Sequence, residues 1–106
     1  MTIYRIEDEK GIGCYTSEVK DNNRNIGNML KKHDDNIYKC PTPYYDNGIE
    51  RRAKREEICG FVSLEQAYNW FSEKEIRKLK KVGFDFKEIK VKKITAVGEK
   101  QCLAIR

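Results

Sequence analysis

The sequence has 106 residues, and 22 Lys and Arg side chains against 17 Asp and Glu side chains give it a formal net charge of +5 at pH 7. This length predicts one domain, and the 39% hydrophobic and 37% charged residues predict a small core under a strongly solvated surface. The longest apolar runs span only a few residues, which excludes a membrane-spanning helix. The first residues contain no apolar signal-peptide core, so we expect a protein of the reducing cytoplasm.

Four cysteines and one histidine are the candidate metal ligands. The cysteines are widely spaced and form no C-x-x-C pair: Cys14, Cys40, Cys59 and Cys102. Because a close cysteine pair is the usual local chelate of structural zinc, we expect buried, reduced thiols and no metal site. The histidine, His33, continues an apolar helical stripe, which favours a core or helix-end position over a catalytic base.

The first third of the chain predicts a strand, a turn and a helix. Thr2–Ile6 is expected to be a strand, and Gly11–Gly13 is a turn too short for a phosphate-binding loop. Cys14–Thr16 is expected to be a short second strand. Asp21 is positioned to cap a helix that ends near His33.

The chain from Asp34 to Gly48 is predicted to be a long loop. Its two prolines exclude a helix and a central strand, and it ends in an Asp-Asn-Gly turn. Three tyrosines lie in it: Tyr38, Tyr44 and Tyr45. Since so many aromatic side chains argue against disorder, we expect the loop, including Pro41–Gly48, to pack on its own domain or on a ligand.

Two helix starts follow one another in the middle of the chain. Ile58–Val62 is expected to be a strand that leads into them. Ser63 with Gln66, and Ser72 with Glu75, have the spacing of capping boxes, in which two side chains satisfy N–H groups of the first turn. This pattern predicts two consecutive helices.

Helical periodicity predicts the buried faces of these two helices. The first is expected to bury four residues: Leu64, Ala67, Tyr68 and Phe71. The second is expected to bury three: Ile76, Leu79 and Val82. Gly83 is expected to end the second helix in a left-handed conformation, with Phe84 making the contact of a Schellman motif.

The last quarter of the chain predicts antiparallel strands. Apolar residues alternate at even positions in Phe84–Phe86 and at odd positions in Ile89–Val91. This change of alternation predicts a bulge at Lys87–Glu88. Ile94–Val97 and Gln101–Ile105 are expected to pair as a hairpin. The resulting order of elements predicts a single α+β domain over the whole chain, with a mostly antiparallel sheet.

The sequence contains no complete catalytic motif. The tyrosine-bearing loop is followed directly by three arginines: Arg51, Arg52 and Arg55. Aromatic faces beside guanidinium groups bind bases and phosphates, and Tyr and Arg are also the preferred anchors of protein interfaces. We therefore take the three tyrosines and these arginines as candidate partner-binding residues, although a solvated structural segment explains the arginines equally well.

The positive charge is concentrated in the second half of the chain. Residues 1–50 carry 7 basic and 9 acidic side chains, a net charge of −2, whereas residues 51–106 carry 15 and 8, a net charge of +7. Much of this excess lies between Lys74 and Lys93. Solvated helix and strand surfaces account for such a run, and a nucleic-acid partner is the alternative.

Three short matches resemble ADP-ribosyltransferase-like domains. They are Tyr4–Arg5 on the first strand, Phe61–Ser63 before a helix, and Glu99–Gln101 before the last strand. In that family an arginine holds the NAD phosphates, a serine-bearing strand supports the site, and a glutamate orients the nicotinamide ribose. The resemblance implies Arg5, Ser63 and either Glu99 or Gln101 as catalytic residues, with NAD as cofactor. Gln101 fits the glutamate position better, but an amide stabilises developing positive charge less well than a carboxylate.

As a whole, the chain also resembles small proteins of bacteriophages and other mobile elements, anti-CRISPR proteins among them. This resemblance implies a protein of the bacterial cytoplasm that binds and inhibits a host protein or ribonucleoprotein complex, without catalysis or a cofactor of its own. An NAD-handling enzyme and a basic nucleic-acid-binding module are the alternative functions. No membrane partner is expected.

Overall fold

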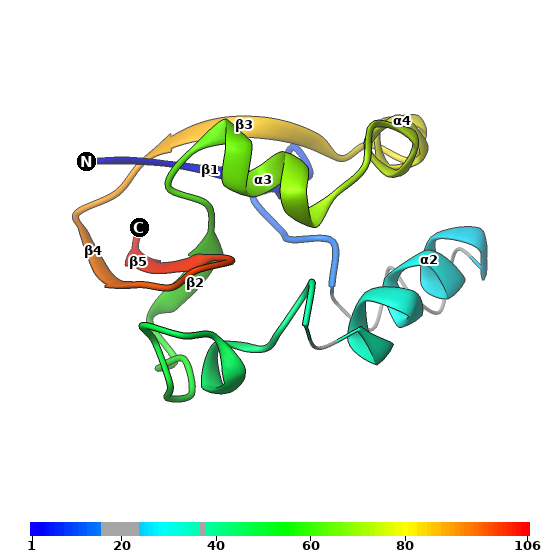
Figure 1. Ribbon diagram of the computed structural model, residues 1–106. Helices are drawn as coiled ribbons and strands as arrows, with labels where there is room; N and C mark the ends of the chain where they lie inside the picture. Colours follow the sequence, from blue (N-terminus) through cyan, green and yellow to red (C-terminus); the bar gives the residue numbers. More distant parts are fainter. Residues whose placement is uncertain (16–23, 37) are drawn as a thin grey trace.

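The structure, a computed structural model, describes the chain outside residues 16–23 and residue 37, and the side chains of these described residues except 24, 25 and 34 (Figure 1). Its elements in chain order are β1 (Thr2–Glu7), α2 (Arg24–Asp35), the short 3-10 helix η1 (Pro43–Tyr45), β2 (Glu57–Gly60), α3 (Leu64–Trp70), α4 (Glu73–Lys81), β3 (Asp85–Lys90), β4 (Lys93–Val97) and β5 (Cys102–Ile105). The predicted α+β fold is confirmed.

The strands form two small antiparallel sheets. β1 pairs with β3 along its whole length, and in the second sheet β5 lies between β2 and β4. A bridge joins the sheets, where Tyr4 and Phe61 exchange two backbone hydrogen bonds of 2.8 Å. This bridge brings β1 beside β2, so that side chains from both ends of the chain meet.

The two faces of the β1–β3 ribbon pack against different apolar clusters. Ile6 and Phe84 belong to an apolar cluster shared with the helices, and Ile3 and Ile89 belong to a second cluster shared with β5. The predicted bulge at Lys87–Glu88 is wrong, because β3 pairs with β1 through these residues without a register shift. The apolar residues change from even to odd positions because each face of the ribbon packs against a different apolar cluster.

The two predicted helix starts are confirmed at Ser63 and Ser72, with one difference in detail. Ser72 forms a full capping box with Glu75. The Ser63 hydroxyl accepts a hydrogen bond from the backbone N–H of Gln66. The Gln66 side chain accepts its hydrogen bond from the backbone N–H of Val62 and not from that of Ser63, so this capping box is incomplete. The amide nitrogen of that side chain, Nε2, donates to the Gly98 and Glu99 carbonyls in the β4–β5 turn, which ties α3 to the hairpin.

The buried face of α3 differs from the predicted one. Ala67 and Phe71 are buried as expected, but Leu64 is 45% exposed and Tyr68 is 51% exposed, whereas Trp70 is buried. α3 has only seven residues, so its packing depends on what its C-terminal end meets, and there Trp70 packs against Phe61.

The C-terminal end of α4 follows the sequence prediction. Gly83 has a φ of 94°, its N–H donates to Lys80, and the Phe84 N–H donates to Leu79. These two bonds define the Schellman motif. Of the predicted buried residues, Ile76 and Leu79 are buried, but Val82 is 39% exposed, because the chain leaves the helix at this residue.

The first half of the chain departs most from the predictions. Gly13 bridges Glu7, and Cys14 and Tyr15 lie in a turn, so the second strand expected there is wrong for these residues. α2 runs to Asp35, past the predicted end, and the expected cap at residue 21 lies outside the described residues.

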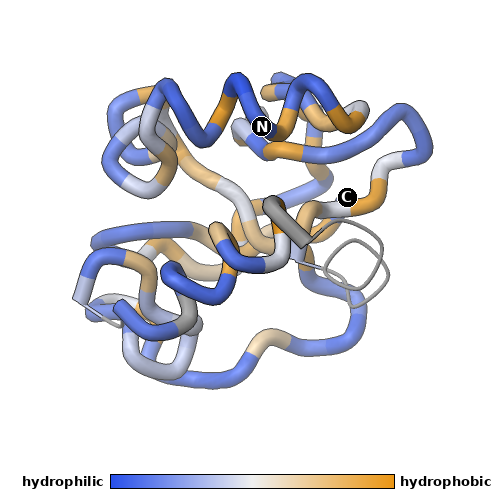
Figure 2. The backbone as a smooth tube through the Cα atoms, turned by 90° about the vertical axis from the view of Figure 1, so that its right-hand side faces the viewer, coloured by the Kyte–Doolittle hydropathy of each residue, from blue (hydrophilic) through white to orange (hydrophobic). Residues whose placement is uncertain are grey.

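Hydrophobic residues follow the segments that cross the middle of the molecule, and the outer loops are mostly hydrophilic (Figure 2).

The predicted C-terminal hairpin is present as β4 and β5, with a register shift between Ile94 and Ala96. In the described part of the chain, no helix is long and apolar enough to cross a bilayer.

Candidate functional site

Two of the three loop tyrosines stand together on η1. Tyr44 is 55% exposed and Tyr45 is 66% exposed, and their rings meet edge to face with centroids 5.1 Å apart. Tyr38 lies closer to α2 and is 87% exposed. The tyrosine loop therefore presents its aromatic side chains to solvent, as expected if it contacts a ligand and not its own core.

The segment that carries Tyr44 and Tyr45 is held on both sides by Lys100 and Gln101, the two residues before β5. The Gln101 amide donates a hydrogen bond of 2.7 Å to the Pro41 carbonyl, on the N-terminal side. On the C-terminal side, the buried carboxylate of Asp46 accepts bonds from the backbone N–H groups of Lys100 and Gln101. Gly98 leaves the space that this carboxylate occupies, because a Cβ there would overlap it. We name the tyrosine segment Pro43–Asp46 the aromatic turn.

The three candidate arginines differ in what they do. Arg51 makes two hydrogen bonds, of 2.7 and 2.8 Å, to the buried carboxylate of Glu57. Arg52 and Arg55 are exposed, and their side chains make no hydrogen bond or ion pair with a described residue. Arg51 therefore has a structural partner, while Arg52 and Arg55 are exposed on the segment that follows the aromatic turn in the chain.

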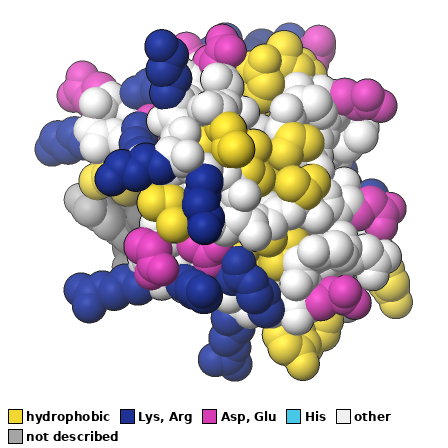
Figure 3. All heavy atoms as spheres, turned by 90° about the vertical axis from the view of Figure 1, so that its left-hand side faces the viewer, with side chains coloured by type: hydrophobic (Ala, Val, Ile, Leu, Met, Phe, Trp, Pro, Cys, Tyr) yellow, Lys and Arg dark blue, Asp and Glu magenta, His cyan; other side chains and the backbone are white. Residues whose placement is uncertain are grey.

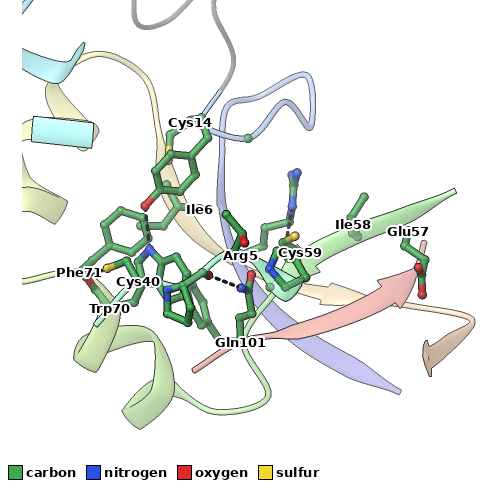
Figure 4. A pocket seen from close by; sticks show the side chains of 17 residues that line it. Arg5, Ile6, Cys14, Cys40, Glu57, Ile58, Cys59, Trp70, Phe71 and Gln101 are labelled. Atoms are coloured by element: carbon green, nitrogen blue, oxygen red, sulfur yellow. Dashed lines mark hydrogen bonds between the residues drawn. The ribbon is translucent and has the colours of Figure 1, made fainter. Parts of the chain in front are cut away.

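A cavity of about 560 Å³ lies between β1, β2, the start of the aromatic turn and the end of α3 (Figure 4). Its lining is mainly apolar and includes Trp70, Phe71 and Pro41. Two polar side chains that the family resemblance singled out, Arg5 and Gln101, both line it. This volume and composition are typical of sites for small organic ligands.

The other two residues of the resemblance lie elsewhere. Ser63 caps α3, and its hydroxyl accepts a hydrogen bond from the backbone N–H of Gln66. Glu99 lies on the exposed β4–β5 turn and accepts a hydrogen bond from the Asn47 side chain. The structure thus brings Arg5 together with Gln101 but not with Ser63 or Glu99.

Arg5 is held by a network that the sequence did not indicate. Its guanidinium donates to the Cys59 and Gly11 carbonyls and to the buried carboxylate of Glu7. Arg106 binds the same carboxylate with two hydrogen bonds, of 2.7 and 2.9 Å. Burial raises the pKa of Glu7, but the hydrogen bonds from Arg106 and Arg5 outweigh it and hold this pKa below its ordinary value.

A chain of polar groups crosses the helical core. The Trp70 indole N–H donates to the Tyr15 hydroxyl over 2.7 Å, and that hydroxyl lies 2.6 Å from Nδ1 of His33. The His33 Nε2 atom lies 2.6 Å from a carboxylate oxygen of Glu75. Every hydrogen has an acceptor if the Tyr15 hydroxyl donates to Nδ1 and Nε2–H donates to Glu75.

This polar chain gives His33 a buried position, as the sequence predicted. Burial raises the pKa of Tyr15, which keeps the phenol protonated as a donor. The partners of His33 could not be predicted, because they come from segments distant in sequence. The one available signal was the single tryptophan, since a buried indole N–H requires an acceptor.

The cysteines are dispersed in the fold. Cys14, Cys40 and Cys102 are buried, and Cys59 is exposed. Among the described residues, no three His, Cys, Asp or Glu side chains form a group that would hold a metal ion.

Comparisons with known proteins place the chain in one family. Searches of curated proteins and of solved structures found no match. The family described as Bacteriophage T4 Y00F protein matches residues 1–106, which is the whole chain. The protein therefore belongs to the Bacteriophage T4 Y00F protein family.

Proposed function

We propose that this phage-family protein is a binding protein that acts in the cytoplasm of the infected bacterium. In this proposal, Tyr44, Tyr45, Arg52 and Arg55 contact a host protein or ribonucleoprotein complex and inhibit it, as anti-CRISPR proteins inhibit their targets. The observation that carries the proposal is the aromatic turn, which exposes two large aromatic side chains on a segment anchored at both ends.

Exposed aromatic side chains on an anchored segment suit binding for an energetic reason. Ordering a mobile loop on association costs free energy, and a segment already held in place avoids much of that cost. Tyr and Arg supply large contact area and directed hydrogen bonds, and they dominate interface hot spots. Arg52 and Arg55 add positive charge that steers an acidic partner toward the aromatic turn.

The surroundings of the turn support the same proposal. η1 and the following basic segment lie together at the lower edge of the molecule in Figure 1. Figure 3 shows the side on which β4 lies, where Lys and Arg side chains are spread over its left and lower parts, with hydrophobic and some acidic side chains among them. Aromatic residues and Arg, as on the aromatic turn and the segment after it, are enriched in protein interfaces.

The test is capture of a partner from bacterial lysate at low salt, with the immobilised full chain. We expect the parent and Tyr68→Ala to retain the same host complex, and the double variant Tyr44→Ala/Tyr45→Ala to lose it. Tyr68 is the matched control because it is 51% exposed on α3, outside the turn. The proposal fails if the parent retains no partner, or if the double variant retains it as well as the parent does.

An NAD-handling enzyme is the second candidate, and the shared cavity of Arg5 and Gln101 favours it. Trp70 is the single tryptophan and lines the same cavity, so its fluorescence should report a ligand bound there. For this candidate we expect a saturable change in Trp70 fluorescence on titration with NAD, and release of nicotinamide that Arg5→Lys reduces. A flat titration rules the enzyme out and leaves the binding proposal untouched.

A further inference from the structure

Four lysines from three segments line one hollow on the helical side of the molecule. The hollow has a volume of about 450 Å³ and lies between α2, the segment after it and the start of α4. α2 and α4 contact one another and lie on the same side of the molecule in Figure 1. We name this site the lysine hollow, after Lys32, Lys39, Lys74 and Lys78.

Among the described residues, no carboxylate forms an ion pair with these lysines. All four are exposed. Because like charges around one concavity repel each other, an anion placed there relieves the repulsion, and the concave shape focuses the potential.

The acidic residue that lines the hollow, Glu75, is already engaged. One of its oxygens accepts a hydrogen bond of 2.9 Å from the Ser72 N–H, and the other lies 2.6 Å from Nε2 of His33. Burial raises the pKa of Glu75, but the bonds from Ser72 and His33 outweigh it, so this pKa is below its ordinary value. The carboxylate therefore serves the helix cap and the histidine, and it forms no ion pair with the four lysines.

An exposed aromatic residue lies next to the hollow in the chain. Tyr38 is 87% exposed, and it lies between Asn36 and Lys39, both of which line the hollow. A basic groove that follows phosphates beside an aromatic side chain that stacks on bases is the usual arrangement for binding single-stranded nucleic acid. A site for free phosphate needs no such aromatic neighbour.

We propose that the lysine hollow binds the phosphate backbone of single-stranded nucleic acid, with Tyr38 stacking on a base at its rim. This site is separate from the aromatic turn, and the inference does not depend on the proposed protein partner. It uses Lys74 and Lys78 from the basic second half of the chain, together with Lys32 and Lys39 from the first half.

The test is the binding of a fluorescein-labelled single-stranded oligonucleotide to the full chain, followed by anisotropy as the salt concentration is raised. We call K32Q/K39Q/K74Q/K78Q the groove variant, because it removes the four positive charges of the lysine hollow. The control K81Q/K90Q/K92Q/K93Q removes the same charge from exposed lysines elsewhere. Each phosphate contact contributes about 0.7 to the slope of log K against log salt for a single strand, so we expect the groove variant to lower the slope by about 3. The control is expected to change it by less than about 1.

Tyr38→Ala is expected to weaken oligonucleotide binding roughly tenfold, and Tyr38→Phe to restore it, because stacking needs the ring and not the hydroxyl. Tyr44→Ala/Tyr45→Ala should bind the oligonucleotide as the parent does, which separates this site from the proposed function. Circular dichroism and Tm verify that each variant is folded.

Three results would overturn the inference. The first is a parent protein that does not bind the oligonucleotide at low salt. The second is a groove variant with the same slope as its charge-matched control. The third is full displacement of the oligonucleotide by inorganic pyrophosphate or ATP at equal phosphate concentration, which would identify a site for small phosphates instead.

Discussion

At the scale of single residues, the carboxylate of Glu57 shows how a buried charge is stabilised in this protein. It accepts hydrogen bonds from the Arg51 guanidinium, the Lys54 N–H and the Thr95 hydroxyl. Removing one partner of a buried, bonded charge destabilises a fold more than removing an exposed charge does, because the remaining charge stays without compensation. Arg51 is for this reason part of the fold, although it comes from the same basic segment as Arg52.

Arg51→Ala is therefore expected to lower the urea midpoint of unfolding clearly more than Arg52→Ala does. Arg52 is the matched neighbour, and its replacement should shift Tm by no more than about 2 °C, as is usual for exposed side chains. Equal effects of the two substitutions would show that the Glu57 carboxylate does not depend on Arg51.

Glu57 also predicts part of the pH dependence of stability. The hydrogen bonds from Arg51 hold the pKa of Glu57 well below its ordinary value of about 4.3. Below about pH 5 the unfolded chain takes up the proton more readily than the folded chain, so the contribution of Glu57 is present at neutral pH and is lost as pH falls.

Glu57→Gln should be less stable than the parent near pH 7 and should lose less stability between about pH 5 and pH 3. Urea midpoints at several pH values measure both effects. Asp46, whose pKa burial raises, acts in the opposite direction, so the comparison of variant with parent is more informative than either curve alone. Parallel pH curves for the two proteins would contradict the role of Glu57.

At the scale of elements, the sequence predicted best the features that are set locally. The Ser72 capping box and the Schellman motif at Gly83 depend on residues within one or two turns of α4, and both are present. The buried face of α3 was predicted wrongly, because Trp70 packs on Phe61 just before the helix and bonds to Tyr15 from a distant segment.

Gly83→Ala is expected to destabilise the protein by about 1 kcal/mol, through the backbone alone. The φ of 94° disfavours any residue with a Cβ, yet a Cβ at this position would meet no atom within 4 Å. Lys81→Ala, in the last turn of the same helix, is the control and should have a much smaller effect in urea unfolding. A neutral Gly83→Ala would mean that the left-handed end is not maintained in solution.

Tyr15→Phe is expected to cost about 1–3 kcal/mol, because it removes the acceptor of the Trp70 indole and a hydrogen-bond partner of His33. Tyr68→Phe is the control, since the Tyr68 ring packs on Phe86 and its hydroxyl makes no hydrogen bond with a described residue. Chemical denaturation of both variants measures the difference. Equal stabilities would show that the polar chain across the core contributes nothing.

At the scale of the whole molecule, the sequence predicted the α+β class and the order of most elements, but not what they bring together. Arg106 bonds to Glu7, 99 residues away in the sequence, and Gln101 bonds to Pro41, 60 residues away. Contacts between residues so far apart leave no periodic or local pattern in a sequence. The lysine hollow escaped prediction for the same reason, since its lysines come from three segments.

The sequence indicated which residues are candidates for binding a partner, but not which contacts each of them makes in the fold. Three tyrosines and three arginines in one stretch indicated an interface, and the structure exposes all three tyrosines. The sequence did not show that Arg51 has a buried partner, or that Lys39, which follows Tyr38, lines a hollow with lysines of α2 and α4.

The central proposal, a partner bound by the aromatic turn, is tested most directly by site-specific photo-crosslinking in bacterial cells. A photoreactive amino acid replaces Tyr44 or Tyr45 in turn, and Tyr68 in the control. We predict that positions 44 and 45 crosslink to the same host protein, that position 68 does not, and that Arg52→Glu/Arg55→Glu weakens the crosslink. The proposal is contradicted if positions 44 and 45 give no discrete adduct, or if position 68 gives the same adduct with equal yield.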